Sequence, residues 1–360
     1  MKDFMMTMEN HFSDLSAALL PWYRGNARDL PWRKTQDPYP IWVSEIMLQQ
    51  TRVAAVLGYY ARFLAAFPTV EDLAAAPEEQ LMKLWEGLGY YSRARNLQKA
   101  AKVVAERGSF PNTYETLLKL PGVGEYTAGA IASAAFGLPC PAVDGNVLRV
   151  MMRLTDCRAD IAEGSVKAAV REALAQIMPK EKGDIRIFNQ ALMELGATVC
   201  LPNGEPKCGA CPMRGRCFAC SRGTVMTLPV KSGKKPRRKE EKTVYVLLQE
   251  GRVALRRRDE SGLLAGLWEF PNLGEKLDEE RAAECLAQWG LTAKAWHKKL
   301  AAKHIFTHVE WHMTGYVLEV EGRGGEDFLW MDPHALREHA VPSAFGKFYD
   351  EACAAMEQEE

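Results

Sequence analysis

The sequence of 360 residues has no excess charge of either sign, no long apolar run and few cysteines. Its 46 basic and 46 acidic residues cancel, which argues against a nucleic-acid binder, since such proteins usually carry a basic excess. No apolar run reaches the roughly 18 residues that a membrane helix needs. Residues 1–10 are polar and mixed in charge, unlike a signal peptide. We therefore expect a cytoplasmic protein without a membrane partner.

Nine cysteines are too few for a disulfide-dense scaffold, and they are unevenly spread. Four are scattered along the chain, as buried small apolar residues often are, and five fall within residues 200–220. In the reducing compartment expected for a chain without a secretion signal, clustered thiols are metal ligands before they are disulfides.

The composition, 47% hydrophobic and 26% charged, is that of a globular protein and excludes collagenous or wholly disordered chains. The length predicts two or three domains. Up to about residue 200, apolar residues recur with helical spacing and strand-like alternation is scarce. Glycine or proline separates most of the predicted helices, which cover residues 43–61, 77–107, 113–120, 125–136, 146–154, 165–178 and 184–195.

The pattern changes after residue 220. Residues 231–242 hold seven basic and two acidic side chains without apolar periodicity, which predicts an exposed linker. Beyond it, β-rich runs predict strands at residues 243–248, 252–257, 311–320 and 328–331, and helical spacing covers 279–289 and 343–356. We predict a helical domain over residues 1–220, a linker over 221–242 and an α+β domain over 243–360.

The cysteine cluster has the spacing Cys200-x7-Cys208-x2-Cys211-x5-Cys217, with Cys220 close behind. Four thiolates on one short loop repel one another unless a cation neutralises them, so this spacing indicates tetrahedral zinc or an iron–sulfur cluster. Spacing alone favours zinc slightly. A second set, with Cys220 in place of Cys200, stays open. Basic residues and no acidic ones surround the cluster between residues 206 and 222, which suits phosphate binding.

The segment Leu120-Pro-Gly-Val-Gly124 joins two predicted helices. Gly122 and Gly124 let the backbone bend and approach a ligand, and the N–H groups that open the next helix suit a phosphate. Thr127, within that helix, is a further candidate for contact with the phosphate. An ordinary helix–helix turn is the alternative, but the complete motif favours a helix-hairpin-helix that grips the DNA backbone without reading sequence.

Two carboxylates are candidates for glycosidic chemistry. Asp144 lies just before a predicted helix, where it could merely cap that helix, and Glu45 lies on another, where it could be a solvated or paired side chain. Together they offer an acid that protonates a leaving group and an ionised group beside an oxocarbenium-like sugar.

The chain resembles the MutY-type adenine DNA glycosylases of the helix-hairpin-helix superfamily, which also contains endonuclease III. The resemblance covers nearly the whole length and rests on motifs in this order: Pro31-Trp-Arg33, Ser44-Glu-Ile-Met-Leu-Gln-Gln-Thr51, Gly87-Leu-Gly-Tyr-Tyr91, Leu120-Pro-Gly-Val-Gly124, Val143-Asp-Gly-Asn-Val147 and Phe188-Asn-Gln-Ala-Leu-Met-Glu-Leu-Gly196. It implies removal of adenine opposite 8-oxoguanine or guanine in duplex DNA by a monomer, in a bacterial nucleoid. It also implies a [4Fe–4S] cluster on Cys200, Cys208, Cys211 and Cys217, against our preference for zinc.

The same resemblance assigns roles residue by residue. Glu45 resembles the acid that protonates the flipped adenine, and Asp144 the carboxylate that stabilises the sugar cation. Tyr126, Asn146 and Glu194 would support them. Residues that resemble the adenine pocket or enter the helix beside the lesion are Arg28, Trp32, Leu48, Gln50 and Tyr90.

Position 126 separates two subfamilies. Endonuclease III-like enzymes carry a lysine there, which forms a Schiff base with the sugar. Tyr126 cannot, so we predict a monofunctional glycosylase that leaves an abasic site. A bifunctional glycosylase/lyase and an inactive DNA-binding or redox module stay as alternatives.

The C-terminal domain resembles the MutT-like (Nudix) domain with which this family recognises 8-oxoguanine. Ala287 and Gln288 stand where a Glu-Glu pair would bind magnesium, so we expect lesion recognition without nucleotide hydrolysis. The recognition loop, usually Phe-Ser-His, is Phe306-Thr307-His308 here; a plain strand edge is the alternative.

Two other positions depart from the family. The first cysteine spacing is x7 where x6 is usual, and Leu148 stands where some members have a lysine that can trap the abasic product.

The zero net charge is a cancellation between regions. Residues 1–230 sum to +3, residues 231–242 to +5 and residues 243–360 to −8. The inference against nucleic acid therefore fails, because it used a total where the distribution matters.

Overall fold

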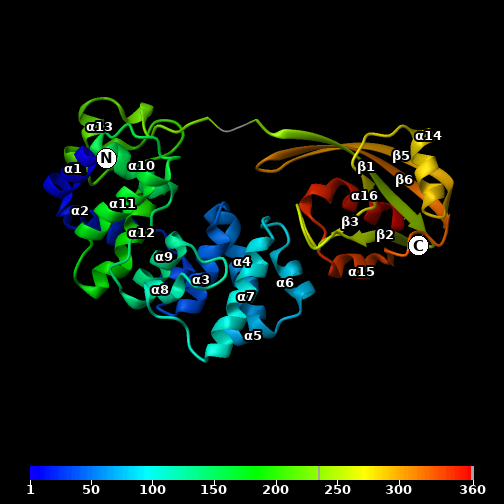
Figure 1. Ribbon diagram of the computed structural model, residues 1–360, viewed down its shortest axis with the longest axis horizontal. Coiled ribbons are helices and arrows are strands. Elements are labelled where there is room, and N and C mark those ends of the chain that lie inside the picture. Colours follow the sequence, from blue (N-terminus) through cyan, green and yellow to red (C-terminus); the bar gives the residue numbers. More distant parts are fainter. Residues whose placement is uncertain (234–235, 358–360) are drawn as a thin grey trace. The chain divides into compact units, whose positions relative to one another are not determined.

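The structure is a computed structural model that describes residues 1–233 and 236–357. Contacts divide the chain into two compact units. The first comprises Met1–Ala75 and Asn96–Gly233, and the second comprises Ala76–Arg95 with the residues described after Gly233. Figure 1 shows helices in the first unit and a sheet with a few helices in the second. No helix in the described part of the chain is long and apolar enough to cross a membrane.

The first unit is helical throughout its described residues, as the sequence predicts. Its α-helices are α1 (Lys2–Phe12), α2 (Leu15–Asn26), α3 (Pro38–Leu48), α4 (Val53–Ala66), α5 (Val70–Ala75), α7 (Ser92–Arg107, which begins in the second unit), α8 (Tyr114–Leu117), α9 (Glu125–Phe136), α10 (Gly145–Thr155), α11 (Gly164–Ile177), α12 (Lys182–Thr198) and α13 (Phe218–Ser221). Short 3₁₀ turns are η1 (Pro31–Arg33), η2 (Cys208–Ala210), η3 (Arg214–Arg216) and η4 (Val225–Thr227).

Two of the predicted helices are interrupted, and this corrects the sequence prediction. Residues 43–61 form parts of α3 and α4, and residues 77–107 form α6 (Glu78–Trp85) and α7. Gln50, between α3 and α4, has φ 60°, and Tyr90, between α6 and α7, has φ 47°. A left-handed residue cannot continue a right-handed helix, and for a residue other than glycine it stores strain. Apolar spacing continues across both breaks and therefore hides them.

Helix α12 organises the first unit by packing against α2, α9 and α10. Its residues Phe188, Leu192 and Leu195 are buried in one apolar core with side chains from α1, α2, α10 and α11. Helix α9 can pack closely because its buried face is made of small residues. At Gly129 an added Cβ would lie 2.3 Å from the carbonyl oxygen of Pro141, so only glycine fits there.

The second unit contains one seven-stranded sheet. Its strands are β1 (Arg238–Gln249), β2 (Arg252–Arg257), β3 (Trp268–Glu269), β4 (Asn272–Leu273), β5 (Leu291–Ile305), β6 (Val309–Gly322) and β7 (Phe328–Met331). The order is β3-β2-β1-β6-β5, with β4 paired to β1 and β7 to β2. Strands β1 and β6 are parallel, and the other pairs are antiparallel.

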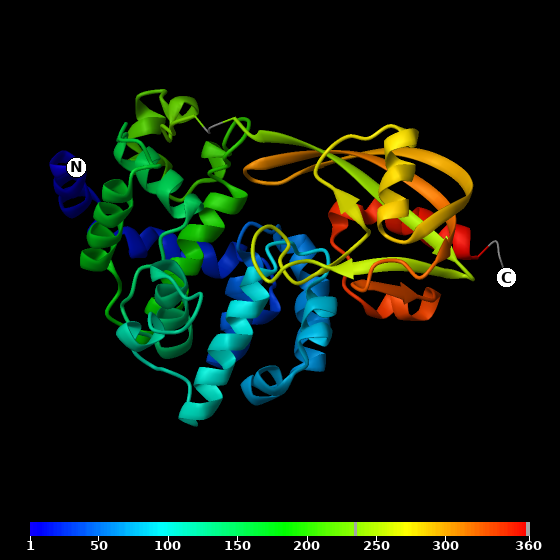
Figure 2. The ribbon, with the colours of Figure 1, turned by 45° about the vertical axis from the view of Figure 1, so that its right-hand side comes forward.

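Alternating side chains of β1 serve two cores. Val244 and Val246 face a core with α16 (Gly346–Met356), whereas Tyr245 and Leu247 face a core with α14 (Glu279–Gln288). The sheet therefore lies between helices, with α14 and α16 on opposite faces (Figure 2). Two short elements, α15 (Pro333–Glu338) and η5 (Ser343–Phe345), complete the unit.

The predicted hairpin is confirmed. Leu248 pairs with Val253 and Gln249 with Arg252, and the two residues between them, Glu250 and Gly251, have φ 50° and 68°. Positive φ at both central residues is typical of a type I′ turn, whose twist matches that of the two strands it joins.

The structure also contains the strands predicted at residues 311–320 and 328–331 and the two predicted helices. The sequence analysis did not predict β5. As an edge strand it exposes many side chains, among them four lysines, which blurs the alternation. The strand β1 also begins earlier than expected. Arg238 and Lys242, which we placed in the linker, pair in register with Val309 and Met313.

Gly129 gives a test of this packing. Gly129→Ala should destabilise the helical unit by about 1–3 kcal/mol, because the new methyl group meets rigid backbone. Gly58→Ala is the matched control, since Gly58 is exposed within α4 and has only the end of the Arg62 side chain nearby. That change should stabilise by up to about 1 kcal/mol. Urea denaturation followed by circular dichroism measures both, and equal effects would contradict the packing.

Candidate functional site

A pocket opens between the helices of the first unit, with an empty volume of about 710 Å³. It is lined from η1, α3, α9, α10 and α12 and the segments beside them. Eight residues predicted from the sequence meet in it: Arg28, Trp32, Glu45, Leu48, Tyr126, Asp144, Asn146 and Glu194. The first two thirds of the chain therefore bring these distant positions into one site.

Glu45, on α3, is held by a tyrosine from α9. The Tyr126 hydroxyl donates to Glu45 Oε2 at 2.7 Å. Burial raises the pKa of Glu45 to about 7, the hydrogen bond from Tyr126 opposes this shift, and the charge of Asp144 adds to it. A carboxyl group with such a pKa is present in both its acid and its ionised forms at neutral pH, as a general acid requires.

Asp144 caps helix α10 and stays in a more polar setting. Its Oδ1 accepts from the Val147 backbone N–H at 2.8 Å, and its Oδ2 accepts from Asn146 Nδ2 at 2.7 Å. Burial raises the pKa of Asp144, while these two hydrogen bonds lower it because they favour the ionised form. The helix-capping reading and the functional reading of Asp144 are thus compatible, since the cap aims the carboxylate at the pocket.

Glu194 is fully buried and bound by two arginines. Arg28 Nε lies 2.7 Å from Glu194 Oε1, and Arg33 Nη2 lies 2.7 Å from Oε2. Burial alone would raise the pKa of Glu194, but the hydrogen bonds from both arginines outweigh it and hold the pKa at about 2. Glu194 is therefore ionised and fixes Arg28 and Arg33 in the pocket wall.

Sequence reasoning missed several residues of the site. Arg33 and Met193 both line the pocket. The sequence analysis gave Arg33 no role beyond its place in a motif, and it did not single out Met193, whose sulfur accepts a 3.3 Å hydrogen bond from the Tyr126 hydroxyl. Arg149 joins the site to the cysteine loop, because it donates to Asn146 Oδ1 and to the Cys200 carbonyl, each at 2.8 Å. In the sequence, only position pointed to the two arginines: Arg33 follows Trp32 in η1, and Arg149 lies one turn after Asn146 in α10.

The hairpin motif lies between α8 and α9. Gly122 has φ 74°, and both Gly122 and Gly124 are exposed, so their backbone can approach a ligand. Thr127 differs from expectation. Its side chain is 2% exposed and accepts from Gln49 Nε2 at 3.4 Å. Thr127 therefore supports the hairpin from inside, and the structure gives its side chain no access to a phosphate.

Two predicted residues lie on strained, exposed backbone. Gln50 is exposed beside the end of α3, and Tyr90 is 45% exposed. In the second unit, the Tyr90 hydroxyl lies 2.6 Å from Thr307 Oγ1. Thr307 and His308 are exposed at the turn between β5 and β6.

Phe306 anchors that turn, with its ring centroid 4.8 Å from that of Trp311. Residues 306–308 therefore form the tip of the β5–β6 hairpin. Tyr90, which was also predicted to lie beside the lesion, contacts this tip through Thr307.

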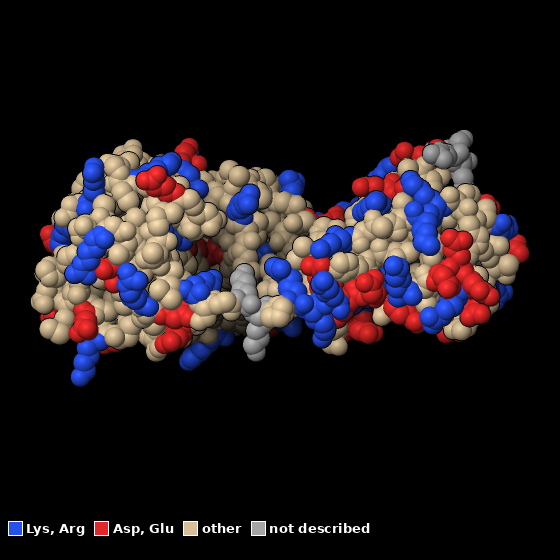
Figure 3. Space-filling model, turned by 90° about the horizontal axis from the view of Figure 1, so that it is seen from above, with Lys and Arg blue, Asp and Glu red and all other residues tan. Residues whose placement is uncertain are grey.

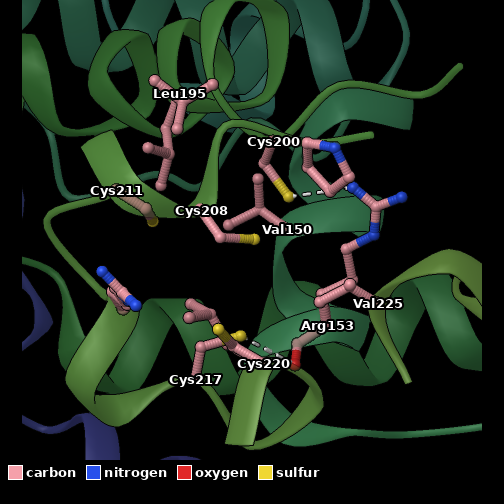
Figure 4. A pocket seen from close by; sticks show the side chains of 13 residues that line it. Val150, Arg153, Leu195, Cys200, Cys208, Cys211, Cys217, Cys220 and Val225 are labelled. Carbon is pink, nitrogen blue, oxygen red and sulfur yellow. Dashed lines mark hydrogen bonds between the residues drawn. The ribbon is translucent and has the colours of Figure 1, made fainter. Parts of the chain in front are cut away.

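The cysteines of residues 200–220 line one cavity with an empty volume of about 400 Å³. All five side chains, Cys200, Cys208, Cys211, Cys217 and Cys220, take part (Figure 4). Within the described residues, no three His, Cys, Asp or Glu side chains converge on a position for one metal ion. The five thiols surround the space of this cavity, and a cluster of several atoms needs such a space.

The chemistry of the cavity also fits a cationic group. Burial raises the pKa of Cys211 to about 12 and that of Cys217 to about 11, so these thiols ionise only if a cation joins them. Arg153 Nη1 donates to Cys200 Sγ at 3.2 Å, as expected beside a sulfur that carries negative charge. The extra residue of the x7 spacing lies in a turn where Gly204 has φ 71°.

Basic residues beside the cavity are only partly free to meet phosphate. Lys207 and Arg214 are exposed, whereas Arg216 and Arg222 form ion pairs with Asp14 and Asp156. On the face that Figure 3 shows, acidic and basic side chains occur on both units.

Glu194→Gln tests the buried ion pairs. The amide cannot balance the charge of Arg28 and Arg33, so the helical unit should lose roughly 2–4 kcal/mol of stability. Glu125→Gln is the control. Both side chains of the Glu125–Arg171 pair are partly exposed, so the pair should contribute within about 1 kcal/mol. Thermal and urea unfolding measure both, and a neutral Glu194→Gln would contradict the proposed charge balance.

Two parts of the chain match known protein families. Residues 43–176 match the HhH-GPD superfamily of base excision DNA repair proteins, and residues 243–351 match the NUDIX domain. A solved structure of a thermostable thymine-DNA glycosylase is 31% identical, with a TM-score of 0.52, and covers 60% of this chain and 99% of its own.

Two curated relatives extend over most of the chain. The adenine DNA glycosylase of Homo sapiens is 38% identical over 92% of this chain and 72% of its own length. That of Buchnera aphidicola subsp. Baizongia pistaciae is 34% identical over 83% of each. With this identity over so much of both proteins, the chain belongs to the adenine DNA glycosylase family, with a helical HhH-GPD core and a C-terminal NUDIX domain.

Proposed function

We propose that this protein is a monofunctional DNA glycosylase that hydrolyses the N-glycosidic bond of adenine mispaired with 8-oxoguanine or guanine in duplex DNA. The observation that carries the proposal is the pairing of Glu45 and Asp144 in one pocket with opposed environments. Glu45 has a pKa near 7, and Asp144 has two donors that favour its charge. Two carboxyl groups held in this way divide the roles of acid and cation stabiliser.

Glu45 supplies the proton. As the bond between the sugar carbon and the adenine nitrogen breaks, its electron pair stays with the base, and Glu45 protonates the base so that it leaves as neutral adenine. The remaining sugar has oxocarbenium character and gains a water oxygen. Ionised Glu45 and solvent can take up the proton that this water releases.

Asp144 faces the sugar cation. Its fixed negative charge is held by Asn146 and by the start of α10, so it need not reorganise when positive charge develops. Arg149 in turn holds Asn146 Oδ1. Asn146 and Arg149 are therefore positioning residues for Asp144.

Adenine must leave the base stack to reach these groups. Trp32 and Leu48 offer apolar surface in the pocket, and Arg28, fixed by Glu194, offers donors for a purine edge. Gln50 and Tyr90, exposed on strained backbone, suit insertion into the duplex where the base has left. The exposed glycine backbone of the hairpin and the N-terminus of α9 suit a phosphate.

Two features favour hydrolysis without a lyase step. Tyr126 replaces the lysine of bifunctional relatives, and no lysine occurs among the described residues that line the pocket. Without an amine near the sugar, a Schiff base cannot form.

The C-terminal unit would read 8-oxoguanine through Thr307, His308 and Phe306, together with Tyr90. Thr307 and His308 lie exposed at a hairpin tip that Phe306 anchors. We include in the proposal a monomeric state and a cytoplasmic location beside the nucleoid.

We further infer that Cys200, Cys208, Cys211 and Cys217 hold a [4Fe–4S] cluster. When bound, this group would supply the positive charge that keeps four thiolates together and would fix the loop that carries Lys207 and Arg214. Arg149 and Arg153 tie the same loop to α10 through Cys200.

Excision of adenine from an A:8-oxoguanine duplex tests the function. The purified protein should yield strand breaks only after hot alkali, and Glu45→Gln should lower the single-turnover rate at least about a hundredfold while duplex binding persists. Glu106→Gln, an exposed change on α7, is the control.

The alternatives predict other outcomes. Breaks without alkali, with borohydride trapping of the protein on DNA, would indicate a bifunctional enzyme. Binding without any excision would indicate a DNA-binding or redox module. An A:G duplex run in parallel measures the mispair preference.

The pKa of Glu45 predicts the pH profile of excision. Because the acid form acts, the rate should fall as the pH rises through about 7. It should also fall in acid, where Asp144 loses its charge. Tyr126→Phe removes a hydrogen bond that lowers the pKa of Glu45, so the alkaline limb should move to higher pH.

Tyr349→Phe in the C-terminal unit is the control and should leave the profile unchanged. An alkaline limb that stays in place, or moves down, in Tyr126→Phe would contradict the role given to this hydrogen bond.

A further inference from the structure

The hairpin tip that carries Thr307 is held by residues that the sequence placed in the basic linker. Arg237 Nε donates to the Phe306 carbonyl oxygen at 3.0 Å. The Arg238 backbone N–H donates to the His308 carbonyl oxygen at 3.1 Å. Because these two carbonyl groups lie on either side of Thr307, the last residues of the linker grip the main chain of the tip at both of its sides.

Strand pairing alone gives the tip little support. The Phe306 N–H donates to the Val309 carbonyl oxygen at 2.8 Å and closes the turn, but Thr307 and His308 are exposed, and β5 lies at the edge of the sheet. A loosely held turn must be ordered when a ligand binds, and that ordering costs free energy. Contacts that order the tip beforehand therefore favour recognition.

Arg237 differs from its neighbour in what its side chain does. The Arg238 side chain pairs with Glu240, so only its backbone contacts the tip. The Arg237 side chain is exposed, contacts Phe306 and has no ion pair within the described residues. A substitution at Arg237 can therefore remove the side-chain contact with the tip while the backbone pairing of β1 stays.

We propose that Arg237 is a positioning residue for lesion recognition, which fixes the main chain at Phe306 so that Thr307 keeps one orientation. The inference rests on the proposed reading of 8-oxoguanine by the C-terminal unit. The Tyr90 hydroxyl, 2.6 Å from Thr307 Oγ1, holds the side chain of the same residue. Main chain and side chain of Thr307 are thus both fixed without DNA.

Such fixing matters because the two bases to be distinguished are nearly the same. 8-Oxoguanine differs from guanine only in a hydrogen on N7 and an oxygen on C8, and N7 of guanine is an acceptor. A hydrogen-bonding group can separate the two bases only if it is placed accurately at this edge. Arg237 should therefore affect the choice between the bases more than it affects excision itself.

The test measures single-turnover excision of adenine from A:8-oxoguanine and A:G duplexes over a series of protein concentrations. The preference is the ratio of the two half-saturating concentrations. Arg237→Ala should lower this preference about five- to tenfold, the size of one lost hydrogen bond. A general loss of stability would weaken both duplexes alike and leave the ratio unchanged.

Two further variants separate the hydrogen bond from the charge. Lys239→Ala removes one positive charge from the same exposed stretch, where Lys239 has no side-chain partner within the described residues, and it should leave the preference unchanged. Arg237→Lys keeps the charge but has a carbon atom where arginine has Nε, so it should behave as Arg237→Ala. A preference that survives in Arg237→Lys would overturn the positioning role.

A double variant shows whether Arg237 acts through the tip. Thr307→Ala removes the group that Arg237 is proposed to position, so Arg237→Ala/Thr307→Ala should have the same preference as Thr307→Ala alone. If the two losses multiply instead, Arg237 acts on the duplex directly and the positioning role is refuted.

The outcomes also separate this inference from the function on which it rests. If the unchanged protein excises adenine from neither duplex, the proposed function fails. If it excises adenine with a preference for A:8-oxoguanine, and Arg237→Ala keeps the full preference, only the role of Arg237 fails.

Discussion

The free-energy cost of burying negative charge determines which partners surround the carboxyl groups of the helical unit. Three carboxyl groups, Glu45, Asp144 and Glu194, reach one pocket, and each meets that cost differently. Glu194 keeps its charge through two arginines, and Asp144 through an amide and a backbone N–H. Glu45 has one hydroxyl donor, so burial raises its pKa to about 7. Three similar groups thereby differ in charge and acidity, as the roles that we propose for them require.

The N-terminal ends of two helices position side chains in this pocket. Asp144 reaches the pocket because it caps α10, and Tyr126 does so because α9 begins at the glycine hairpin. Close packing of α9 depends on Gly129. The same element thus carries the backbone that suits a phosphate and the tyrosine that donates to Glu45, which would couple duplex binding to the geometry of the acid.

The cysteine loop continues this arrangement. Arg149 contacts Cys200 on one side and Asn146 on the other, so the loop and the cap of α10 share one guanidinium. A displaced loop would therefore release Asn146 and weaken the support of Asp144.

The sequence by itself determined the helical core, the hairpin, the cysteine-rich loop of residues 200–220 and the C-terminal α+β unit, because periodicity, turn residues and cysteine spacing are local properties. Family resemblance added the roles of Glu45 and Asp144. The domain limits and the individual site roles remain predictions. Only the tertiary structure decided that α3 ends before Gln50, that β5 forms an edge strand and that Thr127 is buried. It alone decided which arginines neutralise Glu194, because backbone strain, burial and charge pairing depend on residues that are distant in the chain and meet only in the fold.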